Sequence, residues 1–254
     1  MNWRRKRQLL IALIVLSPII IILLLWWFLS RPEPTCFDGI QNQNETGVDC
    51  GGVCGNICQE DIANPVVSWA RTFQISGNVY NAVARIEIPE SNLVAEKVPY
   101  VLRLYDSEGI LISEEERRVD IPPSTSIAVF VPSINPGNRT PVRATVQFSD
   151  DVEWERITAD SVEFRMTDSA QIRDGSFGTE VSVPVTHNSN QVLSNVTLTL
   201  ILFDSDGNAI HTSQTFVEEF NPDDTISLTF TWPQTFSSEI DSVLILPTSY
   251  RLDQ

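Results

Sequence analysis

Hydrophobic positions divide the chain into one long apolar run near its start and many short alternating runs after residue 58. The long run, residues 9–29, reads LLIALIVLSPIIIILLLWWFL and carries no charge. At 1.5 Å per residue it forms about 31 Å of helix, enough to cross the hydrocarbon core of a bilayer. Four cations, Arg4, Arg5, Lys6 and Arg7, precede it, and Trp26, Trp27 and Phe28 lie near its end. This pattern predicts a single-pass signal-anchor in the cell membrane, with residues 1–8 cytoplasmic and the C-terminal bulk extracytoplasmic.

A cleaved secretory signal begins with the same charges and is the alternative interpretation. Its apolar region is usually only about 7 to 15 residues long. The segment that follows the run here, Ser30-Arg31-Pro32-Glu33-Pro34, also has no small-x-small cleavage site. An uncleaved anchor is therefore the prediction.

The short runs after residue 58 alternate apolar and polar positions between Pro, Asn, Asp and Gly, which is typical of all-β proteins. An internal repeat aligns residues 91–109 with residues 189–207 without gaps. We predict an all-β fold of two tandem antiparallel sandwiches, of Ig or fibronectin type III architecture, at residues 62–158 and 159–254.

Alternation assigns a core face and an outer face to each copy of the repeat. The predicted core positions are Val98, Tyr100, Leu102 and Leu104 in the first copy and Val196, Leu198, Leu200 and Leu202 in the second. Their neighbours point outward, namely Pro99, Val101, Arg103 and Tyr105 in the first copy and Thr197, Thr199, Ile201 and Phe203 in the second. Further half-buried strands are predicted at Val142, Ala144, Val146 and Phe148 and at Ile226, Leu228, Phe230 and Trp232.

Two acidic turns, at residues 106–109 and 204–207, follow these strands. D-x-D-G also opens calcium loops, but neither turn has a Glu at the bidentate position. Because Asp caps turns and Gly accepts positive φ, we predict two hairpins.

All four cysteines, Cys36, Cys50, Cys54 and Cys58, fall in a Cys-rich module predicted at residues 30–61. An even number of clustered cysteines on the oxidising side of a membrane predicts two disulfides. The spacing leaves three connectivities open, and a Cys₄ zinc site is the alternative.

The same module carries oxygen ligands at regular intervals, namely Asp38, Asn42, Glu45 and Asp49. Such ligands suit Ca²⁺, and calcium is the one cofactor that the sequence suggests. The alternative is that these residues form turns on a solvated acidic face. The pattern C-x-D-G-x-x-N-x-x-E-x-x-x-D-C-G-G-x-C resembles a short Cys-rich repeat of extracellular and cell-surface proteins, a resemblance that implies no particular activity.

A second resemblance lies in the repeat itself. Leu102-Arg103-Leu104-Tyr105-Asp106 and Leu200-Ile201-Leu202-Phe203-Asp204 resemble the signature of the FxLYD domain, an extracytoplasmic β-sandwich module of prokaryotic envelope proteins. Leu replaces the signature Phe in both copies, and Phe203 replaces Tyr in the second. The resemblance implies a binding or structural module without an assigned reaction.

The net charge of the chain is −16, and residues 1–30 hold four cations and no acid, which leaves −20 on the remainder. So acidic a remainder repels phosphate backbones, which excludes a nucleic-acid partner. The sequence contains no G-x-S-x-G, H-E-x-x-H or Walker motif. Its two histidines, His187 and His211, are expected at loops or strand edges rather than as bases. No catalytic residue is predicted.

These observations together predict a membrane-anchored extracytoplasmic binding or structural protein, not an enzyme, whose partner is an envelope or extracellular protein or polymer. One alternative is an accessory subunit of an envelope secretion or pilus complex. Another is a carbohydrate-binding module or degenerate hydrolase, with a stacking platform made of Trp69, Trp154, Tyr80 and Tyr105. Trp69 and Trp154 are more simply explained as filling the cores or the junction between the sandwiches.

Overall fold

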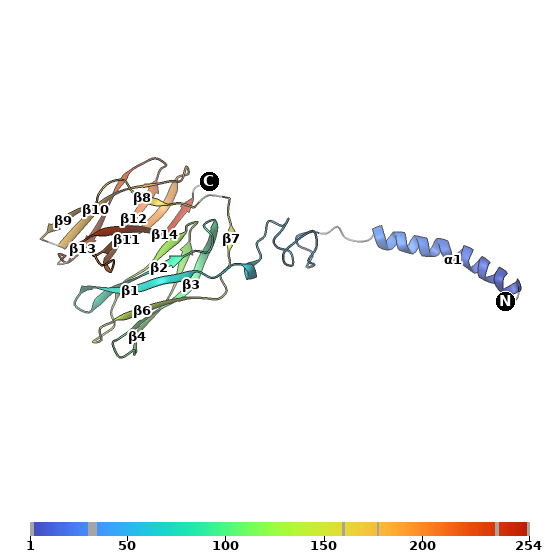
Figure 1. The fold of residues 1–254 in the computed structure, drawn as a ribbon, viewed down its shortest axis with the longest axis horizontal. Helices are drawn as coiled ribbons and strands as arrows, with labels where there is room; N and C mark the ends of the chain where they lie inside the picture. The colour runs from blue at the N-terminus through green and yellow to red at the C-terminus, as the bar shows by residue number, and fades with distance from the viewer. Residues whose placement is uncertain (1–2, 30–34, 159–160, 177, 237–238, 253–254) are drawn as a thin grey trace. The chain divides into compact units, whose positions relative to one another are not determined.

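The computed structural model describes residues 3–29, 35–158, 161–176, 178–236 and 239–252 (Figure 1). The chain divides into two compact units, Met1–Asn56 and Ile57–Gln254. Both predicted sandwiches fall within the second unit. The boundary between the two sandwiches is predicted between residues 158 and 159. Residues 159–160 lie outside the described part of the chain.

The first unit begins with α1, Trp3–Leu29, a helix of 27 residues that includes Pro18. The predicted membrane segment, residues 9–29, lies within this helix, whose described side chains are Arg7, Gln8 and residues 13–27. The large apolar side chains among residues 13–27 are all exposed. Among the described residues, no helix combines the length and the apolarity that crossing a membrane requires.

The second unit begins with a short 3₁₀ helix, η1, at Gln59–Asp61 and is otherwise built of β-strands. Its strands are β1 Val66–Ser76, β2 Val79–Glu87, β3 Leu93–Tyr105, β4 Leu111–Ile121, β5 Ser126–Ile134, β6 Arg143–Phe148, β7 Glu155–Arg156, β8 Phe164–Met166, β9 Gln171–Gly175, β10 Gly178–His187, β11 Leu193–Phe203, β12 Ala209–Phe220, β13 Ile226–Trp232 and β14 Ser242–Leu252.

These strands form antiparallel sheets, which we group in two pairs (Figure 1). The first sheet pair consists of β1-β2-β5 and β4-β3-β6, with β7 also pairing with β3. The second sheet pair consists of β13-β10-β8 and β12-β11-β14, with β9 also pairing with β10. The all-β prediction is confirmed.

Each sheet pair encloses its own hydrophobic cluster. Ile86 of β2 and Leu104 of β3 are fully buried in the first cluster, and Val183 of β10 and Leu200 of β11 are fully buried in the second. All eight predicted core positions of the two repeat copies are buried. The alternation therefore assigned the core faces correctly. Val142, in contrast, is 61% exposed, because β6 begins only at Arg143.

A third cluster joins the two sheet pairs. It contains Val83 of β2, Ala128 of β5, Ile201 of β11 and Leu246 of β14, with Phe203 packed against it. Ile201 points away from the core of its own sheet pair, as predicted, and its side chain is 0% exposed because the other members of this cluster cover it. We name this cluster the junction.

The two repeat copies form the same hairpin. One carboxylate oxygen of Asp106 accepts hydrogen bonds from the backbone N–H groups two and four residues downstream, both at 2.9 Å. The equivalent bonds of Asp204 measure 3.0 and 2.8 Å. Gly109 and Gly207 follow at φ of 77° and 76°. The hairpin prediction is confirmed for both turns.

Candidate functional site

The four predicted cysteines are all oxidised. Cys36 and Cys54 form a disulfide with Cα atoms 5.6 Å apart, Cys50 and Cys58 are disulfide-bonded as well, and no cysteine is free. The prediction of two disulfides is confirmed. The zinc alternative is wrong, because zinc binds thiolates and these sulfurs are consumed in S–S bonds.

The carboxylates suggested for calcium accept hydrogen bonds from nearby N–H groups, whereas the buried Oδ1 atom of Asn42 has no hydrogen-bond partner among the described residues. The Asp49 carboxylate accepts hydrogen bonds from the backbone N–H groups of Asp38 and Gly39 at 2.9–3.0 Å. Asp38 accepts the side-chain amide of Asn42 at 2.9 Å, and this bond is the largest cause of its lowered pKa. Glu45 accepts the backbone N–H groups of Asn42 and Asp49 at 3.2 and 3.3 Å. This geometry supports the turn-forming interpretation, and calcium binding stays a prediction.

A cluster of potential metal ligands in the same module has a different explanation. Among the described residues, only Cys36, Glu45 and Cys54 bring three such atoms within 4.8 Å of one another. Because the two sulfurs belong to one disulfide, the cluster is a buried carboxylate packed against that bridge.

The two histidine rings pack against neighbouring groups of the second sheet pair. His187 is 5% exposed at the end of β10, and its Nε2 donates to the backbone carbonyl of Asn221 at 3.0 Å. His211 stacks on Phe236 with ring centroids 4.0 Å apart, and burial lowers its pKa. Both rings therefore serve packing in their strands.

The four aromatic residues proposed as a stacking platform do not share a surface. Trp154 and Tyr80 are only 4% and 6% exposed, and Trp69 packs against the junction. Tyr105 lies beneath the guanidinium of Arg143, which is 4.4 Å from the ring centroid. The interpretation of Trp69 and Trp154 as filling a junction and a core is confirmed.

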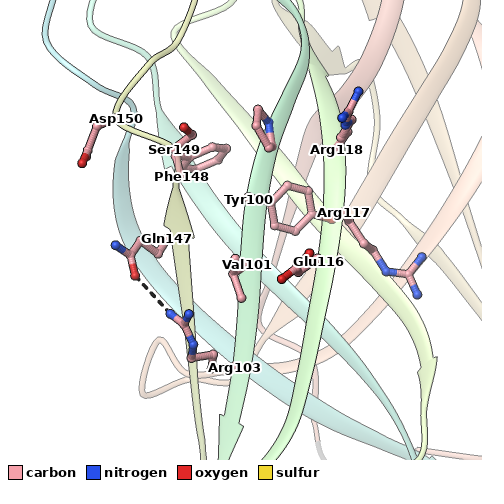
Figure 2. A pocket seen from close by; sticks show the side chains of 11 residues that line it. Tyr100, Val101, Arg103, Glu116, Arg117, Arg118, Gln147, Phe148, Ser149 and Asp150 are labelled. Atoms are coloured by element: carbon pink, nitrogen blue, oxygen red, sulfur yellow. Dashed lines mark hydrogen bonds between the residues drawn. The ribbon is translucent and has the colours of Figure 1, made fainter.

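The outer face of β4-β3-β6 carries a shallow groove of about 540 Å³, shown in Figure 2. We name it the β3 groove. Its lining residues are Pro99, Tyr100, Val101, Arg103, Glu116, Arg117, Arg118, Gln147, Phe148, Ser149 and Asp150. Most of them lie on three neighbouring strands, since Val101 pairs with Glu116 on β4 and with Gln147 on β6. Ser149 and Asp150 directly follow β6.

Charge is distributed unevenly along this groove. Arg103 is held by Glu114 at 2.5 Å and by Gln147 at 3.0 Å, the bond that Figure 2 shows. Glu116 and Arg118, by contrast, form no ion pair within the described part of the chain and are exposed. Arg117, which also lines the groove, is paired with Glu115 at 3.3 Å. The groove therefore offers two ion-paired guanidinia and one unpaired guanidinium beside the carboxylates of Glu116 and Asp150, which suits a polar partner with charges of both signs.

Buried aromatic packing supports the sheet behind the groove. Tyr100 and Phe148 lie 5.9 Å apart between ring centroids and are 4% and 8% exposed. Burial also raises the pKa of the Tyr100 hydroxyl. The strand positions around Val101 are thus fixed before any partner arrives.

A larger concavity, of about 990 Å³, lies where the ends of β3 and β4 approach the end of β14. The Tyr250 hydroxyl donates to the carbonyl of Pro123 across it at 2.5 Å, and burial raises the Tyr250 pKa. Acidic side chains outnumber basic ones in its lining. The hydrogen bond between Tyr250 and Pro123 connects the two sheet pairs, and this connection is the simplest role for the region.

Sequence reasoning did not find the β3 groove, because its residues lie on three strands far apart in the chain. The available signal was Arg103, a charged residue at an outward position of a strand whose repeat partner is Ile201. The chain matches no known protein family and no curated protein.

Proposed function

We propose that this chain is a membrane-anchored, extracytoplasmic binding protein without catalytic activity, and that the β3 groove contacts its partner. In this proposal the two sheet pairs are tandem Ig-like sandwiches of the FxLYD kind. Residues 9–29 anchor them to the cell membrane, and the partner is an envelope or extracellular protein or polymer.

One observation carries the proposal: at equivalent positions of the two repeat copies, the outer face is buried in one copy and lies at the surface in the other. Ile201 on the outer face of β11 is buried in the junction, whereas its counterpart Arg103 stays at the surface beside the groove. A polar face with free charges next to a rigid sheet is suited to recognition.

The oxidised cysteines support placement outside the cytoplasm, because disulfides persist in oxidising compartments. The uncharged run at residues 9–29 and the cations before it support the anchor and its orientation. Envelope placement also agrees with the acidic surface, which repels nucleic acids.

Chemical crosslinking in native membranes, read by mass spectrometry, tests the groove. Arg118→Glu reverses the free positive charge, so we expect at least a fivefold loss of crosslinks between the partner and the groove. Arg173→Glu on β9, an equally large charge change on an exposed side chain, is the matched control and retains them. Equal crosslinking in both variants and the wild type would overturn the role of the groove.

Alkaline carbonate extraction tests the anchor. The wild-type chain should stay in the membrane pellet, whereas Leu16→Lys combined with Ile20→Lys should move it to the supernatant. Each lysine at the centre of a spanning helix costs about 2.5–3.5 kcal/mol on insertion scales. Release of the wild-type chain by carbonate would contradict the anchor without bearing on the groove.

Assays of the purified full chain test the absence of catalysis. Turnover of envelope polymers or peptides would contradict the proposal. Stoichiometric membrane proteins in the crosslinked material would specify an accessory subunit of a larger complex, and hits on a glycan array would specify a carbohydrate partner.

A further inference from the structure

A third cavity, of about 570 Å³, lies apart from the β3 groove and from the larger concavity at Tyr250, where the two sheet pairs meet. It is lined by residues 70–74 of β1, residues 141–143 before and at the start of β6, and Ala209 and Ile210 of β12. The only charged residues in this lining are Arg71 and Arg143. We name the cavity the Arg71/Arg143 pocket.

The charge of this pocket is opposite to that of the chain around it. The chain has 33 Asp or Glu against 17 Lys or Arg, yet no carboxylate contributes to the lining. Two like charges at one cavity are unfavourable unless an anion compensates them. Both side chains are exposed, so solvent screens part of this repulsion, and a bound anion would compensate the rest.

Both arginines are placed by packed neighbours. Arg71 lies on the same face of β1 as Trp69 and Phe73, because side chains two residues apart in a strand point the same way, and these two aromatic side chains pack in the junction. Arg143 pairs with Tyr105 in the strand register, and its guanidinium lies 4.4 Å from the centroid of that ring. A guanidinium stacked on an aromatic ring keeps its in-plane N–H donors available for a ligand.

Neither arginine is neutralised by an ion pair within the described part of the chain. Arg103, Arg117 and Arg139 each form an ion pair, but within the described part of the chain Arg71 and Arg143 form none. The carboxylate of Asp204 feels the field of Arg71 and is committed to backbone N–H groups of its own hairpin. The donors of the pocket are thus left for an external acceptor.

We propose that the Arg71/Arg143 pocket binds an oxyanion, a carboxylate or phosphate group carried by the ligand of this protein. The planar forks of two arginines match the paired oxygens of such groups. The apolar side chains of Val142 and Ile210 would contact the part of the ligand that carries the anion. This site is separate from the β3 groove and requires no membrane, so it goes beyond the function proposed above.

Nitrogen-15 spectroscopy of the arginine side chains tests this site on the full chain in an uncharged detergent. Sodium acetate and sodium phosphate are titrated separately at constant ionic strength, with sodium chloride as the reference. We expect the side-chain signals of Arg71 and Arg143 to shift and to saturate in the millimolar range with acetate, phosphate or both. Saturation with acetate alone identifies a carboxylate site, and saturation with phosphate alone identifies a phosphate site.

Variants distinguish a site from general ion binding. Arg71→Gln should abolish saturation at Arg143, and Arg143→Gln should do the same at Arg71, while the backbone amide spectrum stays that of the wild type. Arg118→Gln removes an unpaired arginine outside the pocket and should leave the titration unchanged. Shifts that rise linearly at every exposed arginine, or that chloride reproduces, would overturn the site and leave the proposed function untouched.

Discussion

The two copies of the internal repeat share their backbone and differ in what covers their outer faces. In β3 and β11 the core positions are buried alike, and a residue with positive φ stands at the same place, Lys97 at 52° and Asn195 at 51°. The outer positions diverge, since Arg103 is partly exposed whereas Ile201 is fully buried. The two copies thus share a buried interior, while one outer face is open to solvent at Arg103 and the other is covered by the junction at Ile201.

The core positions should respond most strongly and equally in the two copies. Leu104→Ala and Leu202→Ala each remove a side chain that is 0% exposed. Each should lower the free energy of unfolding by about 2–5 kcal/mol, because a cavity forms where the chain cannot collapse. Urea unfolding of the full chain measures both, and a loss in only one copy would break the equivalence of the cores.

The outer positions should respond unequally. Ile201→Ala removes junction packing and should cost about 2–4 kcal/mol. Arg103→Ala at the equivalent position removes an exposed ion pair and should change stability by no more than about 0.5–1 kcal/mol. Similar losses in the same urea experiment would show that the two faces are not differently used.

The hairpin glycines provide a smaller, symmetric test. Gly109 and Gly207 have φ of 77° and 76°, and a Cβ at either position would meet no atom within 4 Å. Only the left-handed backbone therefore penalises Ala, at about 1 kcal/mol for each of Gly109→Ala and Gly207→Ala. A thermal midpoint that moves for one variant and not the other would indicate that the two turns differ.

Acid sensitivity gives the smallest expected difference, and it concerns the two hairpin carboxyls. Burial alone would raise the pKa of Asp106, but the backbone N–H of Ile110 and the guanidinium of Arg139 outweigh it, so this pKa lies below the usual range. The pKa of Asp204 is lowered chiefly by the backbone N–H of Asn208. A carboxyl group whose pKa is lower in the native protein than in the unfolded chain stabilises the fold at pH values above the unfolded-state pKa of about 3.9. This contribution to the free energy of unfolding is lost as the pH falls through the native pKa.

Substitution by asparagine should remove that dependence. Asp106→Asn and Asp204→Asn should each be less stable than the wild type at pH 7 and should lose less stability between pH 5 and pH 3. Urea midpoints collected across this range give the slopes. A slope identical to that of the wild type in both variants would show that these carboxyls do not contribute to acid sensitivity.

The sequence predicted the features that repeat within one copy. Alternation assigned the core faces, and the spacing of Asp and Gly predicted both hairpins, because each depends on neighbours in the chain. The junction was not predicted, because the sequence of β11 does not show that another sheet covers its outer face. Ile201 alone resembles any outward residue of a strand. The available signal was a difference between equivalent positions: Ile201 and Phe203 are apolar in the second copy, whereas Arg103 stands in the first copy at the position of Ile201.

The candidate sites were harder to predict for a related reason. Arg103, Arg118 and Gln147 come together only through the register of β3 with β4 and β6. Arg71 and Arg143 meet only where β1, β6 and β12 approach one another. The oxygen-rich spacing around Asp38 and Asp49, by contrast, was evident in the sequence, and the structure uses these carboxylates to cap turns.

Photo-crosslinking in intact cells tests the division of the two faces most directly. A diazirine side chain of aliphatic size is placed at position 103 in one variant and at position 201 in another, and the products are identified by mass spectrometry. If the first outer face is open and the second is covered, position 103 should form adducts with other molecules. Position 201 should form links within the chain, to the region of Val83, Ala128 and Leu246. Adducts to other molecules from position 201, or exclusively internal links from position 103, would contradict it.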